Sequence, residues 1–340
     1  MRRPAVTVAA VCAALIAVMF AANLFAAKHQ SRSTQTLHPR TGLHVSGRNI
    51  VEAGGSSFVM RGVSHPYAWH KDQNRAFADI KRLGANTLRV VLTGGVGAGE
   101  VADVIARCKQ QRLICVLEYH DTTGYGEQDG AVALDTAAEY WTGLRGVLAG
   151  QENFVVVNLG NEPYGNGDTT GWAGATSAAV RKLRDAGLQH LIMVDGPNWG
   201  QDWQGVMRSN AAAVFNSDPR RNIVFSVHMY GVYGTAQKVT DYFDAFHNAG
   251  LPLVVGEFGW KHTDGAVAAD TVMAEAQARG IGYLGWSWSG NSGGVEYLDM
   301  AVGFDPDRLT AWGRRIFGGA DGIRATAKEA TVYGGPAMAR

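Results

Sequence analysis

The chain has 340 residues, of which 46% are hydrophobic and 18% charged, and 31 Lys and Arg against 30 Asp and Glu leave a formal net charge of +1. This balance excludes both the basic surface that nucleic-acid binding requires and the charge excess of a disordered chain. Three cysteines are too few for a disulfide scaffold. A chain of this length folds as two ordinary domains or as one large α/β barrel.

An apolar segment opens the chain. Arg2 and Arg3 precede an uncharged, mostly apolar run over residues 4–27, and residues 28–40 are polar. A basic start followed by an apolar run is typical of a secretory signal, and about 20 apolar residues also suffice to span a bilayer. We therefore expect residues 1–27 to be a cleaved signal peptide or an uncleaved membrane anchor, with a buried core helix as the less favoured alternative. Residues 28–40 would be a tether, and the folded domain would lie outside the cell.

Export permits disulfides, and outside the apolar run only Cys108 and Cys115 remain as a pair. The short turn between a predicted helix and the next predicted strand makes the bridging geometry unfavourable. Two buried free thiols are therefore expected. The spacing of Cys and His residues resembles no zinc site, and we expect no cofactor.

Short runs rich in β-branched residues alternate with helical patterns from residue 59 onward. Buried parallel strands that are covered by helices have this pattern. The predicted strands are 59–64, 87–93, 114–120, 154–160, 191–196, 223–230, 253–258 and 282–288. The predicted helices are 73–83, 100–111, 131–149, 172–187, 236–248 and 266–279. Eight such strands over about 230 residues predict a (β/α)₈ TIM barrel, in which the helix between the fifth and sixth strands is the least defined.

Additions are expected at both ends of the barrel. Residues 43–58 predict a short N-terminal β-hairpin, turned at Gly47 and again at Gly54-Gly55. A helix over 309–317 would close the barrel, so the folded domain is placed at residues 41–318. Residues 319–340 are rich in Gly and Ala and are expected to form a tail that frays.

Carboxylates follow two of the predicted strands at their C-terminal ends, where active sites of this fold lie. Glu162 follows the fourth strand and Glu257 ends the seventh. These strands lie three positions apart in the ring, so the two side chains can face each other across it. A single glutamate after a strand is ordinarily a loop residue, but two facing carboxylates are the machinery of glycoside hydrolysis, in which one is protonated and the other ionised.

Other polar residues at the barrel mouth suit this chemistry. Arg89 lies inside an apolar strand, where an unpaired charge is costly, and with Tyr230 it could hold Glu257 as an anion. Asn161 is suited to bind the sugar 2-hydroxyl, a contact that strengthens in the transition state. His120 and His228 end the third and sixth strands, so the site interpretation is favoured over that of satisfied core histidines.

Glu118 precedes His120 by two residues, and a structural salt bridge is as good an interpretation of it as a site role. The tryptophans are a separate indication, because flat aromatic faces bind the apolar faces of pyranose rings. Those at or after strand C-termini are Trp69, Trp172, Trp199, Trp203, Trp260, Trp286 and Trp288. Trp286 is the strongest candidate for substrate contact, followed by Trp69, Trp199 and Trp260.

The segments around these residues carry a family resemblance. They are FVMRGVSHPYAWHKDQ, LGANTLRVVL, VLEYHDTTG, VVVNLGNEPYG, IMVDGPNWGQDW, VFSVHMYGVYG, LVVGEFGWKHTDG, LGWSWSGN and YLDM, in order over about residues 42–300. Together they resemble glycoside hydrolase family 5, of the clan of retaining (β/α)₈ enzymes, and within it the bacterial endo-β-1,4-mannanase subfamily 8. The resemblance implies that Glu162 is the acid/base and Glu257 the nucleophile. It implies a −1 subsite completed by Arg89, His120, Asn161, His228, Tyr230 and Trp286.

One segment departs from the mannanase pattern: NHAHTW is usual after the first strand, whereas residues 64–69 read SHPYAW. This leaves the catalytic residues untouched but bears on substrate preference. We expect a secreted, monomeric retaining endo-β-1,4-mannosidase that acts on a plant-type polysaccharide such as mannan, galactomannan or glucomannan. An endo-1,4-β-glucanase of the same family is the alternative. A non-hydrolytic polysaccharide-binding protein at the cell surface is disfavoured because both glutamates are present.

Overall fold

The computed structural model describes residues 42–334. The expected signal peptide or anchor (1–27) and tether (28–40) lie outside the described residues, as does the end of the tail (335–340). Within residues 42–334, no helix is both long enough and apolar enough to cross a bilayer.

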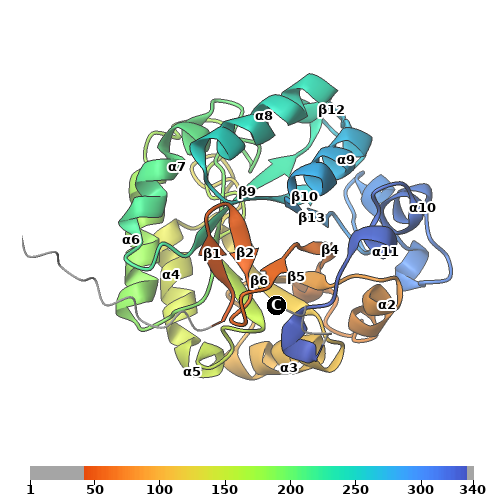
Figure 1. The fold of residues 1–340 in the computed structure, drawn as a ribbon, viewed down its shortest axis with the longest axis horizontal. Coiled ribbons are helices and arrows are strands. Elements are labelled where there is room, and N and C mark those ends of the chain that lie inside the picture. Colours follow the sequence, from red (N-terminus) through yellow and green to blue (C-terminus); the bar gives the residue numbers. More distant parts are fainter. Residues whose placement is uncertain (1–41, 335–340) are drawn as a thin grey trace, which may run out of the picture. The chain divides into compact units, whose positions relative to one another are not determined.

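Eight parallel strands close into a barrel, which confirms the predicted (β/α)₈ fold (Figure 1). They are β4 (Arg61–His65), β5 (Thr87–Leu92), β6 (Ile114–Tyr119), β7 (Val155–Asn158), β8 (Ile192–Asp195), β9 (Ile223–Met229), β10 (Leu253–Phe258) and β13 (Gly282–Gly285). The order follows the chain, and β13 pairs with β4 to complete the ring. Every residue of these strands is buried, which explains their near-continuous apolar sequences.

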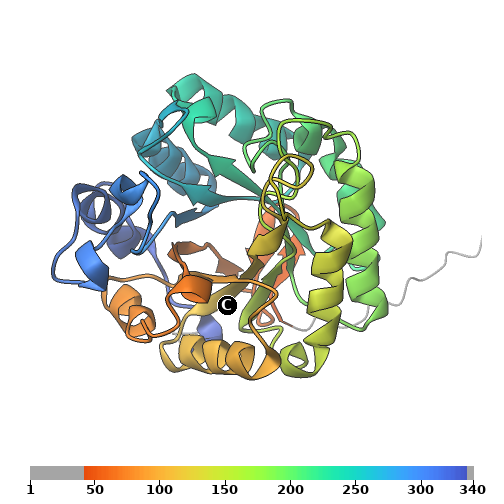
Figure 2. The same ribbon diagram turned by 180° about the vertical axis from the view of Figure 1, so that it is seen from behind.

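Helices surround the barrel, and Figure 2 shows the same arrangement from behind. They are α2 (Ala76–Arg82), α3 (Ala98–Gln110), α4 (Leu134–Gly143), α5 (Arg145–Leu148), α6 (Trp172–Asp185), α7 (Val206–Ser217), α8 (Ala236–Ala249), α9 (Ala269–Arg279) and α10 (Ala311–Gly318). The helix predicted over 131–149 is divided into α4 and α5. Each of the other predicted helices has a counterpart within a few residues.

Helix α8 illustrates how local sequence defines these elements. The hydroxyl of Thr235 accepts a hydrogen bond from the backbone N–H of Lys238 and caps the first turn. Gly250 adopts a left-handed conformation (φ 68°) and ends the helix. The buried side chains recur every three or four residues, at Val239, Tyr242, Phe243 and Phe246. One helix face therefore packs onto the barrel while the other remains in solvent.

Helix α7, between the fifth and sixth barrel strands, is the one that the sequence leaves least defined. Its cap comes from the preceding loop, where the carboxylate of Asp202 accepts from the backbone N–H groups of Met207 and Arg208 at 2.7 and 3.0 Å. Its core-facing side includes the small residue Ala211, so its hydrophobic periodicity is weak. The helix is hard to predict because its cap lies several residues before its first turn and because one of its core-facing residues is small.

A three-stranded antiparallel sheet covers the N-terminal end of the barrel: β1 (His44–Ser46), β2 (Asn49–Val51) and β3 (Ser57–Phe58). Its turns lie at Gly47 (φ 59°) and Gly55 (φ 89°), where the sequence predicts them. The apolar side chains of Val45, Ile50 and Phe58 join a core cluster with residues from the barrel strands. The small sheet therefore closes the barrel at the end opposite to the C-terminal ends of the strands.

The expectation that the tail frays is wrong for residues 319–334. Its short elements, α11 (Ile323–Thr326) and η6 (Thr331–Tyr333), pack against the barrel. Glu52 accepts hydrogen bonds from the backbone and hydroxyl of Thr331 at 2.9 and 2.8 Å, and the Tyr333 hydroxyl donates to the carbonyl of Leu113 at 2.8 Å. Polar contacts to distant parts of the chain outweigh the flexibility that Gly and Ala suggest.

Cys108 and Cys115 are free and buried, as the sequence indicates. The turn between α3 and β6 nevertheless brings their sulfur atoms to 2.7 Å. Burial raises the pKa of the Cys108 thiol well above its ordinary value. Both sulfurs belong to the packed layer between helix and barrel, away from the barrel mouth.

Candidate active site

A pocket of ≈ 490 Å³ opens at the C-terminal ends of the barrel strands. Predicted site residues that line it are His120, Asn161, Glu162, Trp199, Tyr230, Glu257 and Trp286. Arg89 and His228 are fully buried and make hydrogen bonds to residues of this pocket. The structure therefore brings these predicted residues together at the mouth of the barrel, where the fold places its active sites.

Glu257 on β10 receives two donors. Arg89 donates to one carboxylate oxygen at 2.5 Å, and the hydroxyl of Tyr230 donates to the other at 2.8 Å. Burial raises the pKa of Glu257, while the charges of His228 and Arg89 act against that shift. A cation and a phenol thus fix both oxygens of the Glu257 carboxylate and favour its anionic form.

The backbone next to Glu257 explains how this side chain reaches the site. The pairing of β10 with β9 is irregular between Val255 and Glu257, and such bulges re-aim a side chain. A Cβ atom at Gly256 would lie 2.0 Å from the hydroxyl oxygen of Ser226, so only glycine fits between the two strands. This close approach lets β9 and β10 present His228 and Glu257 to the same pocket.

Glu162 follows β7 with a left-handed backbone (φ 40°), which is uncommon for a residue other than glycine. The loop holds this conformation, because the Glu162 carbonyl accepts from the N–H of Gly124 at 2.9 Å. The Glu162 carboxylate lies 2.7 Å from Nδ1 of His228. Such strain, maintained by surrounding contacts, is typical of functional positions.

Arg89 in the middle of β5 connects the two sides of the pocket. Its Nε donates to Asn158 at 3.0 Å, and its terminal nitrogens donate to Glu257 at 2.5 Å and to Asn161 at 2.7 Å. Burial alone would lower the pKa of Arg89, but the carboxylates of Glu118 and Glu257 raise it above its ordinary value. The guanidinium is therefore a permanent cation whose fork fixes the Glu257 carboxylate and the amide of Asn161 together.

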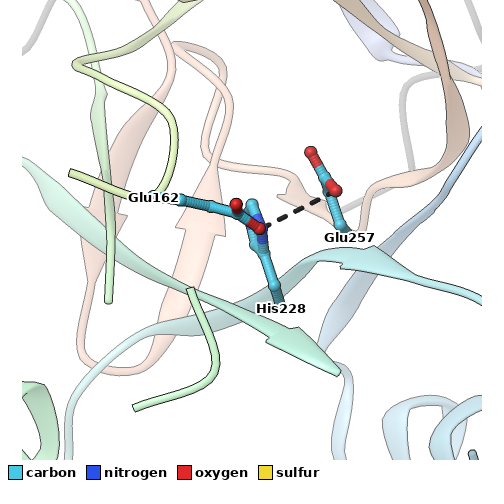
Figure 3. Close-up of side chains that lie close together, drawn as sticks. All are labelled: Glu162, His228 and Glu257. Atoms are coloured by element: carbon cyan, nitrogen blue, oxygen red, sulfur yellow. Dashed lines mark hydrogen bonds and ion pairs between the residues drawn. The ribbon is translucent and has the colours of Figure 1, made fainter. Parts of the chain in front are cut away.

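His228 on β9 lies between the carboxylates (Figure 3). Its Nδ1 is 2.7 Å from Glu162 and 3.7 Å from Glu257, and its Nε2 is 3.3 Å from Asp195. Burial alone would lower the pKa of His228, but Glu257 and Asp195 raise it to about 10. His228 is therefore an imidazolium at neutral pH.

A metal ion is an alternative occupant for this cluster, since ligand atoms of Glu162, His228 and Glu257 lie within 4.8 Å of one another. A histidine must be neutral to bind a metal, because the imidazolium has no free lone pair. The guanidinium of Arg89, which donates to Glu257 at 2.5 Å, already places one cation at this cluster and so disfavours a second.

Aromatic groups form one wall of the pocket. His120 stacks on Trp286 with ring centroids 6.2 Å apart, and Trp69 meets His120 edge-on at 5.0 Å. The Trp286 N–H donates to Asn291 at 2.8 Å, which fixes the indole. Glu118 lies 3.1 Å from Nδ1 of His120, and it raises the pKa of that imidazole against the effect of burial. Glu118 is itself fully buried, in agreement with the structural salt-bridge interpretation.

Comparison with known proteins agrees with this geometry. The family model described as cellulase (glycosyl hydrolase family 5) matches residues 51–292. The chain belongs to glycosyl hydrolase family 5.

Named relatives in this family include the mannan endo-1,4-β-mannosidase of Streptomyces lividans, 59% identical over 300 residues, which are 86% of this chain and 78% of that protein. The β-mannanase/endoglucanase A of Caldicellulosiruptor saccharolyticus is 43% identical over 319 residues, covering 92% of this chain and 23% of that protein. The solved β-mannanase of Thermomonospora fusca is 57% identical, with a TM-score of 0.85 over 86% of this chain and 99% of that chain. That enzyme has also been solved with mannotriose and with mannohexaose.

The predicted tryptophan rim is only partly present. Trp69, Trp203 and Trp260 are 54%, 52% and 43% exposed. Trp260 lines a second cavity of ≈ 510 Å³ instead of the pocket that holds the glutamates. The rim interpretation is wrong for Trp172, which begins α6, and for Trp288: both are fully buried, because the first turn of a helix and the end of a strand also face the core.

The segment that departs from the mannanase pattern, residues 64–69, does not line the pocket as the structure describes it. Ser64 and His65 are fully buried, and the ring of Tyr67 packs against Phe77. Trp69 is the member that reaches the barrel mouth, through its contact with His120. The positions that depart from the pattern therefore lie outside the pocket lining, and Ser64 and Tyr67 belong to the packing beneath the mouth of this family 5 chain.

Sequence reasoning missed Asp195 and Asn158. Asp195 ends β8 and is buried beside His228, and Asn158 ends β7 and bonds both Arg89 and Asp195. Each is a polar residue at the end of an apolar strand, which is the same signal that identified Glu162. Polar residues of the surrounding loops that also line the pocket are Thr123, Asn166, Gln201, His262, Thr263 and Asp264.

Proposed function

We propose that this chain is a retaining endo-β-1,4-mannanase that cleaves β-1,4-mannosidic bonds by double displacement. The observation that carries the proposal is the pair of buried glutamates, each of which has a carboxylate oxygen within 4.8 Å of one on the other, in different electrostatic surroundings. Retaining glycosidases hold their carboxyl groups about 5–5.5 Å apart, whereas inverting enzymes leave about 6.5–9.5 Å for a water molecule. The relatives named as mannan endo-1,4-β-mannosidases support mannan as the substrate.

In the first step, the Glu257 carboxylate attacks the anomeric carbon, while Glu162 gives its proton to the glycosidic oxygen. The bond between that oxygen and the anomeric carbon breaks, and the leaving chain departs with the proton. In the second step, Glu162, now a carboxylate, takes a proton from water as the water oxygen attacks the same carbon. The bond to Glu257 breaks, and the sugar leaves with its original anomeric configuration.

The surroundings of each glutamate suit these roles. Arg89 and Tyr230 hold both oxygens of Glu257, so its attack geometry is set before substrate arrives. Asn161 donates one amide N–H to Thr123 and retains a second for a sugar hydroxyl. Trp286 offers an indole face at the pocket wall for a pyranose ring.

An endo-1,4-β-glucanase activity is the second candidate, because one relative is named for both activities. Mannose and glucose units differ in the orientation of one hydroxyl, and the two glutamates do not distinguish the two orientations. The test is release of reducing sugar from linear mannan, galactomannan and carboxymethylcellulose in parallel. Release from the mannans alone supports the proposal, and release from the cellulose derivative alone contradicts it.

The mechanism has its own test. A Glu257→Ala variant is expected to lose turnover while retaining binding to oligosaccharides, measured by calorimetry. Proton NMR of the first-formed product of the wild-type enzyme should show the retained β-anomer. Undiminished hydrolysis by the variant, or a first product with inverted anomeric configuration, would contradict the two-glutamate mechanism.

We also propose that the enzyme is exported and acts as a monomer. Arg2 and Arg3 followed by the apolar run over 4–27 support export, since a polymeric substrate is met outside the cell. A pocket built by residues of one chain supports action as a monomer. Mass spectrometry of the protein from culture medium and from membranes tests cleavage against anchoring, and sedimentation analysis tests the oligomeric state.

A further inference from the structure

Asp195 has contacts on both sides of the active site without lining its pocket. It ends β8 and is 1% exposed. One carboxylate oxygen accepts from the amide of Asn158 at 3.0 Å. The other accepts from the backbone N–H of Glu162 at 3.4 Å, and lies 3.3 Å from Nε2 of His228 and 3.6 Å from a terminal nitrogen of Arg89.

These four partners belong to the two halves of the reaction. Glu162 and His228 form the acid/base side, because Nδ1 of His228 lies 2.7 Å from the Glu162 carboxylate. Arg89 belongs to the nucleophile side through its bond to Glu257, and Asn158 accepts a hydrogen bond from Nε of Arg89. One buried carboxylate therefore connects the groups that orient both glutamates.

We propose that Asp195 is a positioning residue that keeps His228 doubly protonated and so orients Glu162 and Glu257 for double displacement. This inference rests on the proposed function of the same site. With both ring nitrogens protonated, His228 donates from Nδ1 to Glu162, and Nε2, which makes no hydrogen bond within the described residues, lies 3.3 Å from the Asp195 carboxylate as an ion pair. The doubly protonated ring then places one positive charge beside both glutamates. Each step of the mechanism has one glutamate as an anion, Glu257 in the first and Glu162 in the second, and this charge stabilises it.

The charged groups that face His228 come from several elements. Glu162 follows β7, Asp195 ends β8 and Glu257 lies on β10. Arg89 on β5 is held at 3.6 Å from Asp195 and opposes protonation of the ring. Among the carboxylates, Asp195 is the one that meets Nε2. The pKa of Asp195 itself, which burial alone would raise, is held below its usual value by His228 and Arg89.

The substitution Asp195→Asn tests the charge with little change of shape. An amide in this place can still accept from Asn158, but its NH₂ group would face Nε2 of His228. A neutral His228 with a bare Nε2 is then the favoured form. Asp202→Asn is the matched control, because Asp202 is also buried (2% exposed) and follows the same strand, but caps α7 outside the pocket.

The experiment is a pH titration of the His228 side chain by ¹⁵N NMR in histidine-labelled wild type and both variants, with His228→Gln to assign the signal. The wild-type enzyme should be doubly protonated at His228 at pH 8. Asp195→Asn should lower the midpoint by more than one pH unit and reduce kcat/KM roughly 10–100-fold. Asp202→Asn should change neither quantity.

An unchanged His228 midpoint in Asp195→Asn would overturn the proposal, as would wild-type kcat/KM. If that variant does not fold, the wild-type spectrum still decides, since a neutral His228 at pH 8 contradicts the inference. The kinetics use whichever β-1,4-linked oligosaccharide the wild type cleaves. Failure of the mannan assignment and failure of the Asp195 role are therefore distinguishable.

Discussion

Replacing Arg89 with methionine is expected to destabilise the fold and to inactivate the enzyme for one electrostatic reason. The guanidinium lies 2.5 Å from Glu257, 3.6 Å from Asp195 and 3.9 Å from Glu118, and all of these groups are buried. Arg89→Met keeps much of the apolar volume but leaves three carboxylates without their shared cation. Removing one partner of a buried ion pair costs about 3–5 kcal/mol.

This cost can be converted into a melting temperature. An unfolding entropy of about 2.1 cal/mol/K per residue over roughly 290 residues gives about 0.6 kcal/mol/K, so Tm should fall by about 5–8 °C at pH 8. The loss should be smaller at pH 5. In the variant, the folded-state pKa values of the unpaired carboxylates lie above their unfolded values, so folding takes up protons and stability falls as pH rises. Thermal unfolding followed by circular dichroism at pH 5 and pH 8 measures the difference.

Arg89→Lys is the matched control. Lysine keeps the charge but not the fork that reaches Asn158, Glu257 and Asn161 together. Its Tm should fall less than that of Arg89→Met and with little dependence on pH, while both variants should lose at least about 100-fold in kcat/KM. Equal destabilisation of Arg89→Met at pH 5 and pH 8 would refute the reasoning, because it would mean that charge is not what Arg89 supplies.

Three further outcomes are expected. Tyr230→Phe removes the hydroxyl that donates to Glu257, so kcat/KM should fall roughly 10–100-fold in steady-state assays. Tyr242→Phe is the control: it removes a buried hydroxyl bonded to Asp202 and should retain activity. Glu162→Ala should still cleave aryl glycosides whose leaving group needs no proton, and added azide should accelerate this cleavage. If the variant does not hydrolyse such substrates, the acid/base role of Glu162 is contradicted. Trp286→Ala should raise KM for oligosaccharides by roughly tenfold through loss of the indole face, and an unchanged KM would remove Trp286 from the binding site.

The barrel is predictable from sequence because its signal is local and repeated. Each strand is buried on both faces, so an apolar run marks it wherever it occurs, and the strand predicted at 253–258 agrees with β10 (Leu253–Phe258). The helix α7 is not predictable in this way, since its cap comes from Asp202 in the preceding loop. The packing of the tail is also missed, because it depends on Glu52, which is distant in sequence.

The same distinction holds for the site. Glu162, Glu257 and Arg89 are each marked by a polar residue in or after an apolar strand, and the fold rule then places them at the barrel mouth. Asp195 carries the same mark, but its contacts with residues of three other barrel strands, β5, β7 and β9, are not revealed by sequence spacing. For tryptophans, strand and helix ends indicate position along an element but not which side faces solvent, so the burial of Trp172 and Trp288 does not follow from their positions in the sequence.

The packing of residues 319–334 has a consequence for how the protein is made. The acceptor at Glu52 and the carbonyl of Leu113 belong to parts of the domain that leave the ribosome early, and their partners Thr331 and Tyr333 lie 279 and 220 residues further along the chain. The contacts that fix residues 319–334 to the domain therefore form only after translation has passed residue 333. A chain truncated shortly after residue 318 would keep Glu162 and Glu257 but lack these contacts, so proteases should cut it faster than the chain that includes them.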